Sequence, residues 1–117
     1  MNGSLLKFYV HENQLHHGHV LWEWLLSHAR EIGIRGGSAF KGTGGFARAH
    51  TLAQHHPLEL TGSQTVEIEF LVSDQEADRL LDWVREQKIQ TFYSSSPARF
   101  GLSDAVEPSP GVLPGDP

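Results

Sequence analysis

The segment Lys41-Gly-Thr-Gly-Gly-Phe46 places one positive charge beside three glycines. Backbone N–H groups at glycine can approach an anion without a Cβ in the way, and Arg48 and His50 follow within a few residues. The predicted ligand-binding set is Lys41, Gly42, Gly44, Gly45, Phe46, Arg48 and His50. The spacing is not that of a P-loop. The alternative is a strand bend that leads the chain into a long loop.

Histidines form a second candidate, because His16, His17 and His19 lie within four positions. Neighbouring imidazoles could bind Zn²⁺, Ni²⁺ or Cu²⁺, although adjacent loop histidines rarely converge on one ion. A capping or packing role at the start of a helix is the alternative. The chain has no cysteine, and no G-x-S-x-G elbow marks a serine nucleophile, so the sequence does not predict an enzyme.

The charge of the chain is unevenly distributed. The 117 residues carry a net charge of −5, which argues against nucleic acid as a general partner. Residues 33–58 contain basic residues and no carboxylate, whereas residues 59–86 are rich in carboxylates. A cationic segment in an acidic chain favours a small anionic ligand or an acidic protein partner. No apolar run is long enough for membrane insertion, and the lack of cysteine and of a signal-like N-terminus leads us to expect a cytoplasmic protein.

Hydrophobic periodicity predicts six elements to position these residues. The expected strands are 5–10, 38–41, 65–72 and 89–93, and the expected helices run from His19 to Gly33 and onward from Ser73. Ser73 and Glu76 have capping-box spacing, and Gly33 is placed to end the first helix. A long loop, 47–62, separates two strands. The expected domain spans residues 1–93, and the proline-rich residues 94–117 are expected to be a disordered tail.

The predicted order βαββαβ corresponds to an α+β protein. It packs as a four-stranded antiparallel sheet with both helices on one face. The other face would expose Leu5, Tyr9, Leu71 and either Ile89 or Phe92. Exposed apolar residues on a sheet face usually find a partner surface, so we expect the chain to self-associate through this face.

The chain resembles the small PII-like proteins of domain-of-unknown-function family 190. The resemblance spans roughly residues 5–93 and is carried by "HG-x-x-L" at 17–21, "GIRGGSAFKGTGGF" at 33–46 and "HT" at 50–51. It implies a ferredoxin-like fold and a homotrimer, similar to PII signalling proteins and CutA-type proteins. In PII proteins the loop between the second and third strands reaches partner proteins, and its base holds ATP or ADP.

The leading hypothesis is therefore a non-enzymatic, PII-like trimeric regulator. A small anionic ligand, with an adenine nucleotide as the candidate cofactor, would bind beside Lys41–Phe46. Binding would redirect residues 47–62 toward a protein partner such as a membrane transporter. One alternative is a CutA-like metal-binding protein that uses the His-rich loops. Another is a small enzyme with a site at the subunit interface.

Overall fold

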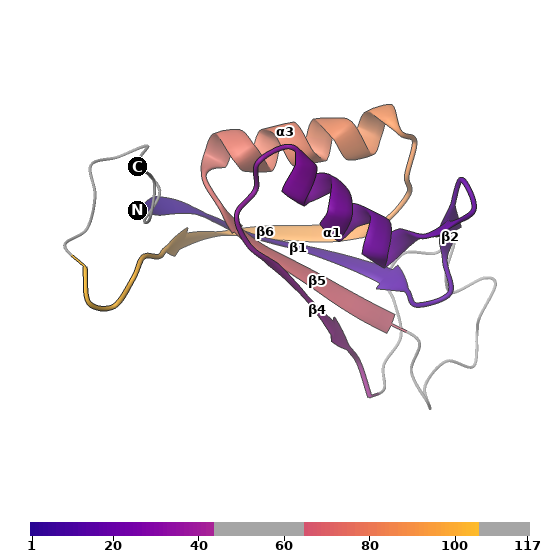
Figure 1. The fold of residues 1–117 in the computed structure, drawn as a ribbon, viewed down its shortest axis with the longest axis horizontal. Coiled ribbons are helices and arrows are strands. Elements are labelled where there is room, and N and C mark those ends of the chain that lie inside the picture. Colours follow the sequence, from indigo (N-terminus) through magenta and orange to yellow (C-terminus); the bar gives the residue numbers. More distant parts are fainter. Residues whose placement is uncertain (44–64, 106–117) are drawn as a thin grey trace.

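The structure is a computed structural model, and it describes residues 1–43 and 65–105. Four strands form the main sheet: β1 (Asn2–His11), β4 (Gly37–Lys41), β5 (Thr65–Val72) and β6 (Phe92–Arg99). Two helices lie on it: α1 (Leu21–Glu31) and α3 (Asp74–Glu86). A small hairpin of β2 (Leu15–His16) and β3 (His19–Val20) joins β1 to α1 (Figure 1).

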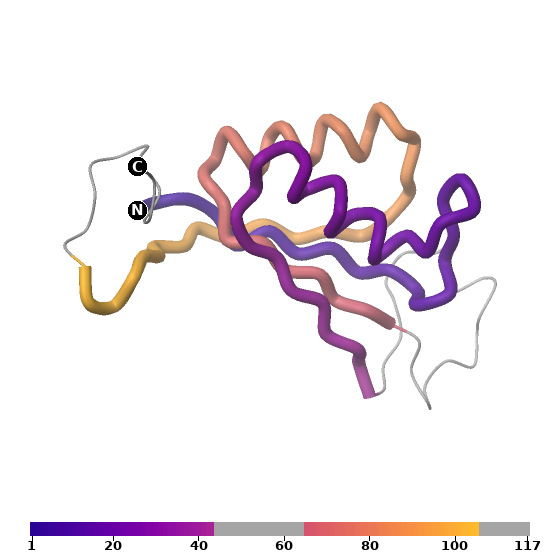
Figure 2. The backbone as a smooth tube through the Cα atoms, in the orientation of Figure 1, coloured from indigo at the N-terminus to yellow at the C-terminus, as the bar shows by residue number. Residues whose placement is uncertain are grey.

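The main sheet has the strand order β4-β5-β1-β6, and each neighbouring pair is antiparallel. Both helices lie on the same side of this sheet, and none of the described segments covers the opposite face (Figure 2). This architecture confirms the predicted α+β, ferredoxin-like βαββαβ fold. Alternate residues of each strand therefore meet either the helices or the open side.

The core lies between the sheet and the helices. From the strands it takes Leu6, Phe8, Val10, Val66, Ile68, Phe70 and Val72. From the helices it takes Leu21, Leu25, Ala29, Ala77, Leu80 and Val84. The rings of Phe8 and Phe70 meet edge-to-face with centroids 6.3 Å apart. Burial of each large side chain contributes roughly 1.5–3 kcal/mol, so this layer dominates the stability of the fold.

Local signals predict the C-terminal end of α1 and the N-terminal end of α3, whereas α1 begins at Leu21 and not at the expected His19, because His19 and Val20 form β3. Gly33 follows α1 with φ of +96°, a conformation that glycine adopts without strain. Ser73 and Glu76 form the complete capping box of α3. The Ser73 hydroxyl accepts from the Glu76 N–H at 3.1 Å, and the Glu76 carboxylate accepts from the Ser73 N–H at 2.8 Å. The capping box thereby satisfies backbone N–H groups at the start of α3.

The fourth strand begins later than predicted and extends further. Ile89 ends the turn after α3, where its N–H donates to the Val84 carbonyl at 3.1 Å, and its side chain packs against the core. Strand β6 then runs to Arg99, through residues expected to belong to the tail. An edge strand tolerates serines and Pro97 because its pairing to β1 uses the backbone and occupies one side only. Residues 100–105 of the expected tail follow β6, and residues 106–117 lie outside the described residues.

Candidate functional site

The best candidate for a ligand contact is Lys41, the last residue of β4. Its side chain is 63 % exposed, and its Nζ lies 3.1 Å from Oε2 of Glu12, just beyond β1. Residues 33–58 contain no carboxylate, and Glu12 comes from outside that range. A salt bridge this exposed contributes about 0–1 kcal/mol, so a stronger anion can replace the Glu12 carboxylate.

Gly42 has a structural contact that its sequence position did not reveal. Its N–H donates to the Thr65 carbonyl at 2.8 Å, which joins the end of β4 to the start of β5. This N–H holds the two strands together and is not turned toward a ligand. Among the predicted site residues, the structure thus places Lys41 and Gly42 at one end of the sheet. The others lie outside the described residues: Gly44, Gly45, Phe46, Arg48 and His50.

The histidine-rich segment 16–19 is the turn of the β2–β3 hairpin. His17 and Gly18 have φ of +50° and +81°, and His16 pairs with His19 across them. Two successive positive φ values are typical of the type I′ turn that closes a two-residue hairpin. The His16 ring lies 4.3 Å from Trp24 and the His19 ring 6.3 Å from it, between centroids. Within residues 1–43 and 65–105, no three metal-ligating side chains come together in a way that could hold an ion.

This aromatic packing continues across the outer surface of the helices. The Trp24 ring meets Trp83 of α3 at 5.2 Å, and His28 stacks on Trp83 at 3.6 Å with 13° between the planes. Burial lowers the pKa of His28, and the nearby Glu31 carboxylate partly opposes that shift. Burial thus disfavours the charged form of His28, which packs on Trp83 as an aromatic ring. Trp24 and Trp83 thus join both helices to the β2–β3 hairpin.

The open face of the sheet has a charged centre. Lys7 of β1 lies between Glu67 and Glu69 of β5, with its Nζ 3.7 Å from a carboxylate oxygen of each. A side-chain hydrogen bond with Glu67 raises the pKa of Glu69, and partial burial and the Glu67 charge act in the same direction. Lys7 opposes the shift. One lysine ammonium group thus lies between two carboxylate side chains.

Apolar side chains flank this charged centre. Phe40 is 52 % exposed, Leu71 49 % and Phe92 36 %. Register places Leu71 opposite Leu5, and the Tyr9 and Phe92 rings lie 5.7 Å apart. Of the two residues predicted for the last open-face position, Phe92 is the exposed one and Ile89 packs on the core. The open face therefore combines exposed apolar side chains with a charged cluster at its centre.

Comparison with known proteins places this architecture in a family. Residues 3–98 match the model of the family DUF190, described as "Uncharacterized ACR", and the chain belongs to this PII-like family. A UPF0166 protein of Aquifex aeolicus (strain VF5) is 24 % identical over 82 residues, which cover 70 % of this chain and 78 % of that protein.

A solved structure extends the comparison to three dimensions. It is that of a proposed PII-like signaling protein from Thermus thermophilus, with a TM-score of 0.58 and 14 % identity. The match covers 84 % of this chain and 87 % of the other, and it shows a shared fold. Among the described residues of the present chain, no helix is long and apolar enough to span a membrane.

Proposed function

We propose that this chain is a PII-like regulatory protein that senses a small anionic ligand, an adenine nucleotide being the candidate. The observation that carries the proposal is Lys41: a largely exposed cation, held by one carboxylate, at the end of β4. The cationic, glycine-rich residues 42–50 follow it directly in the sequence. A phosphate group that displaces Glu12 would gain a charge-assisted hydrogen bond from the Lys41 ammonium.

The same proposal includes a homotrimer formed through the open sheet face. Three large apolar side chains, Phe40, Leu71 and Phe92, lie exposed around the Lys7–Glu67–Glu69 cluster. Each face carries both signs of charge, so faces of identical copies can complement one another. The family resemblance favours three copies.

The proposal also includes a signalling step, in which residues 47–62 respond to the ligand. Ligand binding beside Lys41 would redirect residues 47–62, which lie outside the described residues, toward a partner protein such as a membrane transporter. The family resemblance supports this step, as does the sequence position of that segment between the end of β4 at Lys41 and the start of β5 at Thr65. The absence of cysteine supports a cytoplasmic location.

Calorimetry with ATP, ADP and AMP tests the ligand site. Lys41→Ala should weaken binding of the preferred nucleotide about tenfold or more, because a charge-assisted hydrogen bond is lost. Glu12→Gln should strengthen binding, because it removes the carboxylate that competes for Lys41. Added NaCl should weaken binding to the parent protein.

The matched control is Arg85→Ala, which removes an exposed cation from α3 and should leave binding unchanged. The proposal fails if the parent protein binds no nucleotide. It also fails if Lys41→Ala and Arg48→Ala both bind as the parent does.

A further inference from the structure

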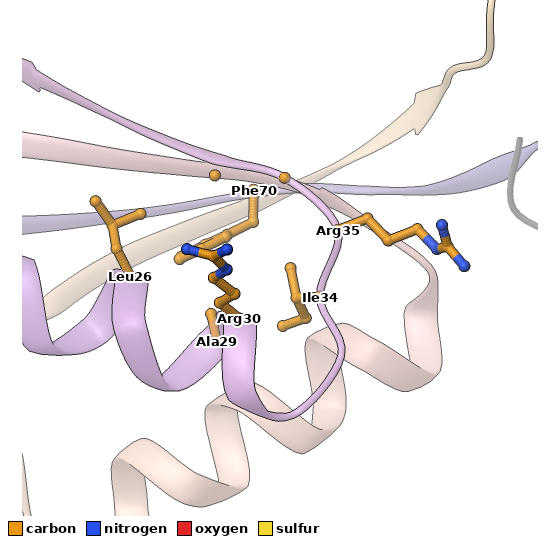
Figure 3. A pocket seen from close by; sticks show the side chains of 8 residues that line it. Leu26, Ala29, Arg30, Ile34, Arg35 and Phe70 are labelled. Carbon is orange, nitrogen blue, oxygen red and sulfur yellow. The ribbon is translucent and has the colours of Figure 1, made fainter. Parts of the chain in front are cut away.

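A cavity of about 290 Å³ opens between the last turns of α1 and the start of β4 (Figure 3). Its apolar lining comes from Leu26 and Ala29 of α1, Ile34 of the following loop, and Phe70 of β5. Because β4 is an edge strand, the cavity lies at the border of the sheet. Its volume is near the lower limit of ordinary small-molecule sites, which favours an occupant smaller than a nucleotide.

Two glycines account for this space. A Cβ at Gly37 would lie 2.6 Å from Cε1 of Phe70 and 3.0 Å from Cδ2 of Leu26, so a larger residue there would disturb both neighbours. A Cβ at Gly36 would meet nothing within 4 Å. At these two positions the chain enters β4 without a side chain that would fill the cavity.

One arginine lies over the apolar lining. Figure 3 shows the Arg30 side chain between Leu26 and Ile34, with its guanidinium directed toward Phe70, whereas Arg35 points away. The Arg30 side chain makes no ion pair or hydrogen bond with another described residue. The cavity lining contains no carboxylate. An arginine without a carboxylate partner, above an apolar surface, favours an anionic group attached to an apolar body.

We propose that this cavity binds a small amphipathic carboxylate. The apolar body packs against Leu26, Ile34 and Phe70, and the carboxylate pairs with the Arg30 guanidinium, whose fork of N–H donors matches two oxygens. The site is distinct from Lys41, which lies at the other end of β4, about 13 Å away at the rise of a strand. It requires neither Lys41 nor assembly of the chain, so it extends beyond the function proposed above.

The test uses 2-naphthoate and its uncharged analogue 2-naphthamide, each titrated into ¹⁵N-labelled protein and followed by amide chemical shifts. Binding in the cavity should shift the amides of residues 26–37 and of Phe70. Naphthoate should bind the parent protein about tenfold more tightly than naphthamide, because the Arg30 pair is charge-assisted. Arg30→Gln should weaken naphthoate about tenfold and leave naphthamide unchanged. The matched control Arg85→Gln should change neither affinity, and the spectrum of each variant reports that it is folded.

Four outcomes would overturn the proposal. Naphthamide could bind as tightly as naphthoate, which would make the cavity a purely apolar site. Arg30→Gln could behave as Arg85→Gln does. The shifts could be absent or fall around Lys41 or on the open sheet face. Finally, dilution alone could shift the amides of residues 26–37, which would show that a second copy fills the cavity. Retained naphthoate binding in Lys41→Ala would separate this site from the nucleotide site, so either hypothesis can fail alone.

Discussion

The two faces of the sheet use the same strands for different purposes. On the covered face, Leu6, Phe8 and Val10 of β1 are inaccessible to solvent and belong to the core that includes residues of both helices. On the open face, the intervening residues Lys7 and Tyr9 meet carboxylates and aromatic rings. Successive side chains of a strand point to opposite sides, so a slip of one residue would exchange the two sets. The covered face therefore fixes the strand register. The side chains of the open face remain available for polar, charged and aromatic contacts.

The largest expected effect is the loss of stability caused by a substitution on the covered face. Phe8→Ala should lower the free energy of unfolding by about 3–5 kcal/mol, because the cavity left behind adds to the lost burial. Phe40→Ala, on the half-exposed open face, should cost less than about 0.5 kcal/mol in the isolated chain. Urea unfolding followed by circular dichroism measures both values.

Repeating the unfolding measurements of both variants at several protein concentrations makes this test more specific. If the open face is an assembly surface, the cost of Phe40→Ala should grow as the protein concentration rises. The cost of Phe8→Ala should change little with concentration. Equal costs for the two variants at every concentration would contradict the distinction between the faces.

An intermediate effect is expected for assembly. Leu71→Lys places a charge among the apolar residues of the open face and should weaken self-association about tenfold or more, because a desolvated charge opposes burial. Sedimentation equilibrium at micromolar concentration should give a trimer for the parent protein and a smaller mass for the variant. The control is Leu102→Lys, which changes an exposed leucine outside the sheet. A monomeric parent, or an unchanged mass for Leu71→Lys, would contradict the prediction.

The smallest expected effect is the pH dependence of folding stability that comes from Glu69. The pKa of Glu69 in the folded chain is raised above its ordinary value of 4.5, so the folded state holds this proton more tightly than the unfolded state. Stability from this group is present below pH 4.5 and is lost as pH rises through the raised pKa. Glu69→Gln removes the ionisable group, so the variant does not lose this stability as pH rises. The variant should therefore become more stable relative to the parent with rising pH, by at most about 1 kcal/mol at this partly exposed site.

Unfolding measured from about pH 4 to about pH 8 tests this sign. Glu86→Gln, at an exposed position on α3, is the control and should show no such trend. A parent protein whose stability relative to Glu69→Gln rises with pH would contradict the assignment.

Sequence periodicity predicted the parts of the fold that depend on local pattern. Val66, Ile68 and Phe70 alternate with Glu67 and Glu69, and the observed strand has the predicted limits, Thr65–Val72. The helix ends at Gly33 and Ser73 were predictable because each depends on residues within one turn.

Contacts between distant segments were not predictable in this way. Glu12 reaches Lys41 from another part of the chain, and the hydrogen bond from Gly42 to Thr65 depends on strand register. His17 and Gly18 carried a turn signal, since a two-residue hairpin requires positive φ at both positions. This turn signal was hard to recognise because His17 occupies the position where asparagine is more usual. The sequence showed a net cationic segment, but not which carboxylate would face its lysine.

The position of β1 in the sheet has a consequence for the order of events during synthesis. This strand precedes every other element, yet both of its partners come late: Ser4 pairs with Val72 of β5, and Asn2 pairs with Arg99 of β6. As the ribosome extends the chain, Leu6, Phe8 and Val10 must wait without a strand partner until those distant segments emerge. Pairing across such long separations is slow, and an apolar strand left waiting is prone to aggregate. The most buried strand of the folded protein is thus the segment of the nascent chain that is most exposed to aggregation.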